Sequence, residues 1–136
     1  MVLPSSPKRP VRGGGKGNRP KRVTALFFRS ASGSEPVRNA LRELTKDERQ
    51  EVARDVRTAE YGWPIGMPVC RAMGDGLHEI RTGLPTRIFR ILFRVDARER
   101  MVLLHGFIKK TQATPREDID LANRRWSAYM KDQRDG

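Results

Sequence analysis

The sequence predicts an α+β domain: a small curved, mainly antiparallel four-stranded sheet with two N-terminal helices and one C-terminal helix. Three observations lead to this prediction. One early and three later segments have the apolar, β-branched composition of strands, and apolar residues recur at helical spacing between them. A helix-start signal with proline follows the last strand. The order β-α-α-β-β-β-α is typical of an α+β fold, and the sequence leaves open where the first strand pairs.

The first half of the domain is predicted to be one strand followed by two helices. VTALFFR, residues 23–29, is a β-branched and aromatic run typical of a strand. Pro36 suits the first turn of the next helix. The apolar residues of that helix recur at spacings of four and three: Val37, Leu41 and Leu44. Thr45 and Glu48 form a T-x-x-E capping box that begins the second helix, and Gly62 ends it.

The second half is predicted to be a three-stranded meander and a last helix. Residues 62–76 contain glycine and proline throughout and are predicted to form a loop. The three strand segments follow at residues 77–81, 87–95 and 101–108. Thr114 and Pro115 then mark the capped start of the final helix, with proline at its first position.

Charge and composition divide the chain into a tail and a folded part. Residues 1–22 are rich in proline, glycine and basic residues and are predicted to be a disordered basic tail, either an RNA-binding arm or a solvated leader. The folded domain is predicted over residues 23–132, with 133–136 as a flexible end. The tail accounts for +7 of the net charge of +12 and leaves +5 for the rest. That remainder weakly favours a polyanionic partner.

Several classes of protein are disfavoured by what the sequence lacks. No segment approaches the roughly 18 consecutive apolar residues of a membrane-spanning helix, and the basic N-terminus has no apolar segment of a secretory signal. Cys70 is the only cysteine, which excludes an internal disulfide and favours a reducing, cytoplasmic setting. The two histidines, His78 and His105, match no metal-ligand spacing, so neither metal nor another cofactor is expected.

Strand alternation predicts a cationic face on the sheet. Phe89, Ile91 and Phe93 would form a core face, which also holds Arg87, whereas Arg90 and Arg94 would point the opposite way. A hairpin in the expected register would place two further charged residues beside Arg90, with two lysines at the end of the adjacent strand: Glu79 and Arg81, then Lys109 and Lys110. These side chains could form a groove for an anion, or could be solvated residues and a surface ion pair.

Three segments together resemble the HigB-type toxins, the phage-derived host-killer branch of the RelE-like superfamily. They are GLHEIR, RIFRILF and LLHGFIKKTQATP, and the resemblance is strongest over residues 76–123 and loosely covers 23–130. It implies a small curved sheet with two N-terminal helices and one C-terminal helix. It also implies the toxin of a type II toxin–antitoxin system, a metal-independent endoribonuclease that cuts mRNA, typically on the ribosome. The expected partner is an antitoxin that often carries a helix-turn-helix domain. The toxin would contact operator DNA only indirectly, through this antitoxin.

The resemblance also implies which residues act on RNA. Cleavage by the ribose 2′-hydroxyl needs a base, cations for the developing phosphorane charge, and an acid for the leaving 5′-oxygen. Arginine is a poor base because it stays protonated, and the tyrosine that some relatives carry early in the last helix is missing here. The base is therefore Glu79, a histidine or a lysine with a lowered pKa, and His105 is a candidate acid. The predicted catalytic residues are Arg81, Arg90, Lys110, Glu79 and His105, and the predicted RNA-binding residues are Lys109, Arg87 and Arg94.

Two alternatives to an active ribonuclease stay open at this point. The sequence pI of about 11.0 and the basic tail also fit a non-catalytic RNA- or ribosome-binding protein. The missing early tyrosine also fits an inactive toxin-fold partner of a helix-turn-helix regulator.

Overall fold

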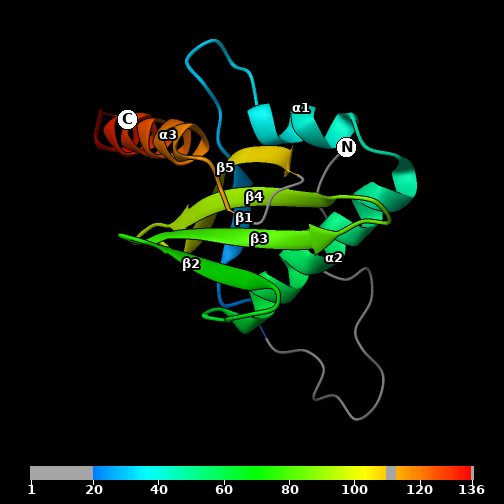
Figure 1. Cartoon of the computed structure of the whole chain (residues 1–136). Coiled ribbons are helices and arrows are strands. Elements are labelled where there is room, and N and C mark those ends of the chain that lie inside the picture. Colours follow the sequence, from blue (N-terminus) through cyan, green and yellow to red (C-terminus); the bar gives the residue numbers. More distant parts are fainter. Residues whose placement is uncertain (1–19, 110–112, 136) are drawn as a thin grey trace.

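A five-stranded sheet lies between two helices on one face and a third helix on the other (Figure 1). This computed structural model describes residues 20–109 and 113–135. The strands are β1 (Thr24–Phe27), β2 (Cys70–Gly74), β3 (Leu77–Gly83), β4 (Ile88–Val95) and β5 (Arg100–Lys109). They are ordered β1-β5-β4-β3-β2, with β1 parallel to β5 and all other neighbours antiparallel. The α+β class is confirmed, and the first strand pairs with the last.

The sheet has one strand more than the four predicted, because β2 lies in the segment that was predicted to be a loop. β2 forms an edge of the sheet and pairs with β3 through a two-residue turn. Asp75 and Gly76 occupy this turn with φ of 53° and 85°. Positive φ at both central residues is the geometry that Asp-Gly favours in a tight hairpin. The dipeptide was therefore the signal for the missed strand.

Helices α1 (Pro36–Arg42) and α2 (Lys46–Gly62) cover one face of the sheet. Their apolar residues pack with those of β3, β4 and β5 into the larger core. The predicted apolar face of the first helix is confirmed for Val37 and Leu41, which are fully buried. Leu44 is almost fully buried as well but follows the end of the helix at Arg42. The predicted capping box is confirmed as well. The Glu48 N–H donates to Thr45 Oγ1 at 3.2 Å, and the Thr45 N–H donates to Glu48 Oε1 at 3.0 Å.

Helix α3 (Arg116–Asp135) covers the opposite face and packs on β4 and β5. A second apolar cluster lies beneath it, which includes Leu92 of β4 and Tyr129 of the helix. The Tyr129 hydroxyl donates to Asp96 Oδ2 at 2.6 Å, and burial together with this bond raises the pKa of Tyr129 to about 12. The Arg94 guanidinium lies 4.9 Å from the centre of the Trp126 ring. Polar contacts therefore help to fix this helix on the sheet.

A β-bulge interrupts the pairing of β4 with β5. Leu92 pairs with His105 and Phe93 with Leu103, so Leu104 is an extra residue in β5. Before the bulge, odd-numbered residues of β5 face α1 and α2. After it, His105 and Phe107 face α3 instead, while Gly106 faces α1.

The ends of the predicted domain are only partly covered by the described residues. Residues 1–19 of the predicted tail, and residue 136, lie outside them. Lys21, which was assigned to the tail, makes an ion pair of 2.9 Å with the buried carboxylate of Glu60. Helix α3 includes residues 133–135 of the predicted C-terminal end. Among the described residues, no helix has the length and apolar character needed to cross a membrane.

Candidate functional site

The predicted charged residues of β3 and β4 share the sheet face that α3 covers in part. Arg81 pairs directly with Arg90, and Glu79 pairs with Leu92, which contacts α3. Directly paired residues of antiparallel strands point to the same side of the sheet. The prediction that Glu79, Arg81 and Arg90 lie on one face is therefore confirmed.

Glu79 and Arg90 form a fully buried charged pair beneath the start of α3. Both side chains are 0% exposed, and Arg90 Nη1 lies 3.6 Å from Glu79 Oε2. Thr114 joins the two residues: its hydroxyl donates to Glu79 Oε2 at 2.6 Å and accepts from Arg90 Nη1 at 3.2 Å. In this structure neither predicted catalytic residue reaches solvent. Their contacts hold the start of α3 against the sheet.

Arg81 is the member of this group that reaches the surface. Its side chain is 17% exposed, and its Nε lies 3.7 Å from Glu79 Oε1. That oxygen accepts no hydrogen bond from the described part of the chain. Glu79 therefore faces a buried arginine through one oxygen and a partly exposed arginine through the other. The arrangement presents one guanidinium to an anionic ligand and supports it with charge from below.

His105 also lies on this face but is used to dock α3. Its Nε2 lies 2.7 Å from Asp118 Oδ1, and its Nδ1 lies 3.5 Å from Arg125 Nη1. Because aspartate accepts and arginine donates, a neutral ring with its proton on Nε2 satisfies both neighbours. Burial lowers the pKa of His105 and outweighs the opposing effect of Asp118. The ring also stacks on Phe107, with centroids 4.8 Å apart.

The burial of both histidines predicts that the protein loses stability in mild acid. The pKa of His78 is lowered as well, by burial and then by Arg94. Between their folded values and the ordinary value of 6.5, the unfolded chain binds more protons than the folded chain. The histidine contribution is fully present above 6.5 and is lost as the pH falls below it. The free energy of unfolding should therefore decrease between about pH 7.5 and pH 5.

Urea unfolding across this pH range measures the effect. The variant His105→Gln keeps a donor for Asp118 but cannot titrate, so its stability should depend less steeply on pH than that of the wild type. A wild-type stability that rises as the pH falls from 7.5 to 5 would contradict the prediction.

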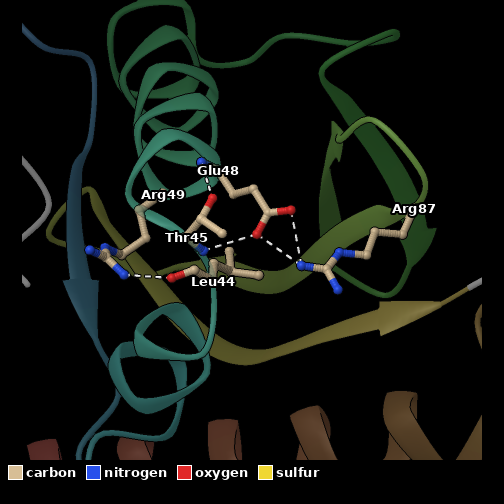
Figure 2. Close-up of polar contacts among 5 residues, drawn as sticks. All are labelled: Leu44, Thr45, Glu48, Arg49 and Arg87. Carbon is tan, nitrogen blue, oxygen red and sulfur yellow. Dashed lines mark hydrogen bonds and ion pairs between the residues drawn. The ribbon is translucent and has the colours of Figure 1, made fainter.

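Arg87 lies apart from this group and supports the start of α2. Figure 2 shows its guanidinium beside Glu48, the residue of the capping box, with Nη2 at 2.8 and 2.9 Å from the two carboxylate oxygens. The backbone N–H of Thr45, together with Arg87, lowers the pKa of Glu48 despite the opposing effect of burial. Nearby, Arg49 Nη1 donates to the Leu44 carbonyl at 2.6 Å. The structure does not bring this predicted RNA-binding residue to the group around Arg81.

Replacing Arg87 with alanine should therefore distinguish support of the start of α2 from the predicted role in RNA binding. We expect a small loss of thermal stability, because the capping box loses a cation that holds its carboxylate. We expect any activity on RNA to stay within about twofold of the wild type, as for a substitution away from the site. Thermal unfolding and an RNA-cleavage assay measure the two effects. A large loss of cleavage with unchanged stability would contradict the structural role.

The remaining predicted RNA-binding residues have different positions. Arg94 lies on the same face as Arg90 but stacks on Trp126, where it contributes to the docking of α3. Lys109 ends β5 and pairs with Ile88. Lys110, a predicted catalytic residue, lies outside the described residues. On this face, Glu79 therefore contacts both Arg81 and Arg90, whereas His105 contacts α3.

Comparison with known families finds a match for this chain. The family described as phage derived protein Gp49-like (DUF891) matches residues 39–127, which is more than half of the chain. The chain belongs to this Gp49-like family. It is a family of RelE/HigB-like toxins, so the chain is a toxin-like protein, and such a family generally implies an antitoxin partner. Among curated proteins, none matches the chain significantly.

Three polar residues of this Gp49-like chain were not singled out as part of the site from sequence. They are Thr114, Asp118 and Arg125, all in or just before α3. Thr114 was interpreted only as a helix-start signal, and the other two lie in the helix that follows it. One signal was available in the sequence. Thr114 and Pro115 begin a helix with acidic residues in its first turn, and those residues could face a strand rich in arginine.

The described residues contain no other group with the features of a catalytic centre. No cluster of three His, Cys, Asp or Glu side chains among them could hold a metal ion. Burial and then Asp55 raise the pKa of Cys70 to about 11, so its thiol stays protonated at neutral pH. The group around Arg81 is therefore the candidate site.

Proposed function

We propose that this protein is the toxin of a type II toxin–antitoxin system, a HigB-type endoribonuclease that cleaves mRNA on the ribosome without a metal ion. One observation carries the proposal: a member of a RelE/HigB-like toxin family holds Arg81 at its surface above the buried Glu79–Arg90 pair. A guanidinium held in this way suits the charge of a scissile phosphate. The resulting arrest of translation would last until an antitoxin binds.

The proposed reaction is attack of a ribose 2′-oxygen on the adjacent phosphorus. The 2′-hydroxyl proton passes to a base, the bond from phosphorus to the 5′-oxygen breaks, and an acid protonates that oxygen. Arg81 stabilises the negative charge on the phosphorane. One such donor can contribute about 2.7–4 kcal/mol to the transition state. Arg90 positions Arg81 through Glu79, which is their shared carboxylate.

We propose that Glu79 and His105 transfer the protons, and that Lys110 and Lys109 supply further positive charge. Glu79 is covered by Thr114, and His105 is bonded to Asp118. Either residue could act on RNA only after the start of α3 moves away from the sheet. Binding of RNA at Arg81 would therefore have to be coupled to a displacement of this helix end.

Cleavage in a translation extract tests the function. Purified protein added to a translated mRNA should produce fragments that end in a 2′,3′-cyclic phosphate and begin with a 5′-hydroxyl, the products of 2′-oxygen attack. Primer extension locates the cuts, and a parallel reaction without ribosomes shows whether the ribosome is required. Intact mRNA with a correctly folded sample would contradict the proposal. Salt-sensitive RNA binding without cuts would instead indicate a non-catalytic RNA-binding protein.

The proposed partner is an antitoxin with a helix-turn-helix domain, through which the complex would reach operator DNA. Inducing this protein alone should arrest growth. Co-expression of a small helix-turn-helix protein encoded beside it should restore growth. Growth arrest that persists despite formation of the complex would contradict neutralisation by that partner.

A further inference from the structure

We infer that Arg71, on the edge strand β2, forms a phosphate-binding subsite beside Arg81, so that single-stranded RNA crosses the outer strands of the sheet next to α3. The inference rests on the proposed function, since it extends the path of the same substrate. Arg71 was not among the residues predicted from sequence. β2, its strand, was itself missed.

The position of Arg71 follows from the register of β2 and β3. Arg71 pairs directly with Glu79, so both side chains belong to the sheet face that carries Arg81. The preceding residue agrees with this assignment, since Cys70 is buried in the core on the opposite face. Arg71 is diagonal to Arg81, at a separation of about 7–8 Å that long side chains can bridge. Two guanidinium groups can therefore hold neighbouring phosphates of one strand.

The charges explain why Arg71 is available to a ligand. A carboxylate directly opposite an arginine would ordinarily form an ion pair with it. Here Glu79 is fully buried, and its carboxylate lies against Arg90, Thr114 and Arg81 instead. Arg71 is exposed and forms no ion pair with any described residue. Glu79 is the only acidic residue in β2, β3 and β4, so positive charge prevails across these strands.

The chemistry of this surface favours a nucleic acid backbone. Arginine binds phosphate oxygens with a planar fork, and a row of separated guanidinium groups fits a polymer with regularly spaced charges. The row leads from the edge of the sheet to Arg81, so a strand bound along it would bring a phosphate to the proposed catalytic arginine. The subsite would act on affinity and not on the chemical step.

Binding of a short single-stranded RNA at several salt concentrations tests the subsite. The variant Arg71→Ala should bind roughly three- to tenfold more weakly, and the slope of log affinity against log salt should fall by about 0.7 for one lost phosphate contact. Arg71→Lys keeps the charge and should keep the slope. In the ribosome assay, Arg71→Ala should raise KM and leave kcat unchanged. Arg54→Ala is the matched control, an exposed arginine on α2 on the opposite face.

The possible outcomes separate this inference from the proposed function. Cleavage by the wild type with unchanged RNA binding by Arg71→Ala would overturn the subsite and leave the function intact. Absence of RNA binding by the folded wild type would overturn the subsite, and the cleavage assay then decides the function independently. Weaker binding of a polyglutamate peptide by Arg71→Ala, with RNA binding unchanged, would overturn the subsite and assign this arginine to recognition of an acidic protein.

Discussion

Replacing Glu79 with alanine is expected to lower the free energy of unfolding by about 3–5 kcal/mol, the cost of removing one member of a buried charged pair. The carboxylate faces Arg90 at 3.6 Å, and both side chains are inaccessible to solvent. Its removal takes the negative charge of Glu79 away from the buried guanidinium. It also removes the acceptor of the Thr114 hydroxyl, so the start of α3 should loosen as well.

Urea unfolding measures this loss, and two further variants show its cause. Glu79→Gln keeps an acceptor for Thr114 but not the charge, and should fall between the wild type and the alanine variant. The double variant Glu79→Leu with Arg90→Met removes both charges and should recover much of the stability, because apolar residues often replace a buried ion pair at little cost. A loss below about 1 kcal/mol for Glu79→Ala, within the range of surface pairs, would contradict the structure of this cluster.

Replacing Arg81 with alanine is expected to reduce mRNA cleavage by about 10²–10³-fold, the usual effect of removing one preorganised donor from a developing anion. Stability should change little, because Arg81 is partly exposed and its distance to Glu79 is a long 3.7 Å. The two replacements thus differ in kind. Loss of Glu79 should damage both the fold and the activity, whereas loss of Arg81 should damage the activity alone.

Single-turnover cleavage and growth arrest on induction measure the effect of the Arg81 variant, and thermal unfolding shows that it is folded. Arg81→Lys keeps a positive charge without the planar fork and should retain an intermediate rate. Full toxicity of a folded Arg81→Ala variant would exclude this residue from the site.

Local sequence signals were sufficient for most of the fold. Thr45 and Glu48 specify the start of α2 because a capping box needs only residues three apart. The alternation of β4 identified its core face because β4 is central and long. β2 was missed because a short edge strand with few buried residues has little alternation to read, and only its Asp-Gly turn distinguishes it.

The sequence predicted which residues share the face of the candidate site, but not which of their side chains are exposed to solvent. Alternation and hairpin register place Glu79, Arg81 and Arg90 on one face, and both are local properties of β3 and β4. Which of the three is covered depends on Thr114, a residue distant in sequence that α3 brings to the sheet. Sequence therefore indicated which charged residues share this face, whereas the structure distinguishes the buried Glu79–Arg90 pair from the one accessible arginine among the three.

Leu104 is the residue of β5 that the pairing with β4 skips. Leu103 faces α1 and α2, whereas Leu104 and His105 both face α3. Deleting Leu104 would therefore join Leu103 to His105 in regular alternation and leave every other side chain of the strand on its present side. Deleting Gly106 instead would bring Phe107 to the side of α1, where even a Cβ at Gly106 would lie 3.0 Å from Phe89 and 3.6 Å from Ala40. The strand can thus lose one residue at the bulge without exchanging its two faces, but not beyond it.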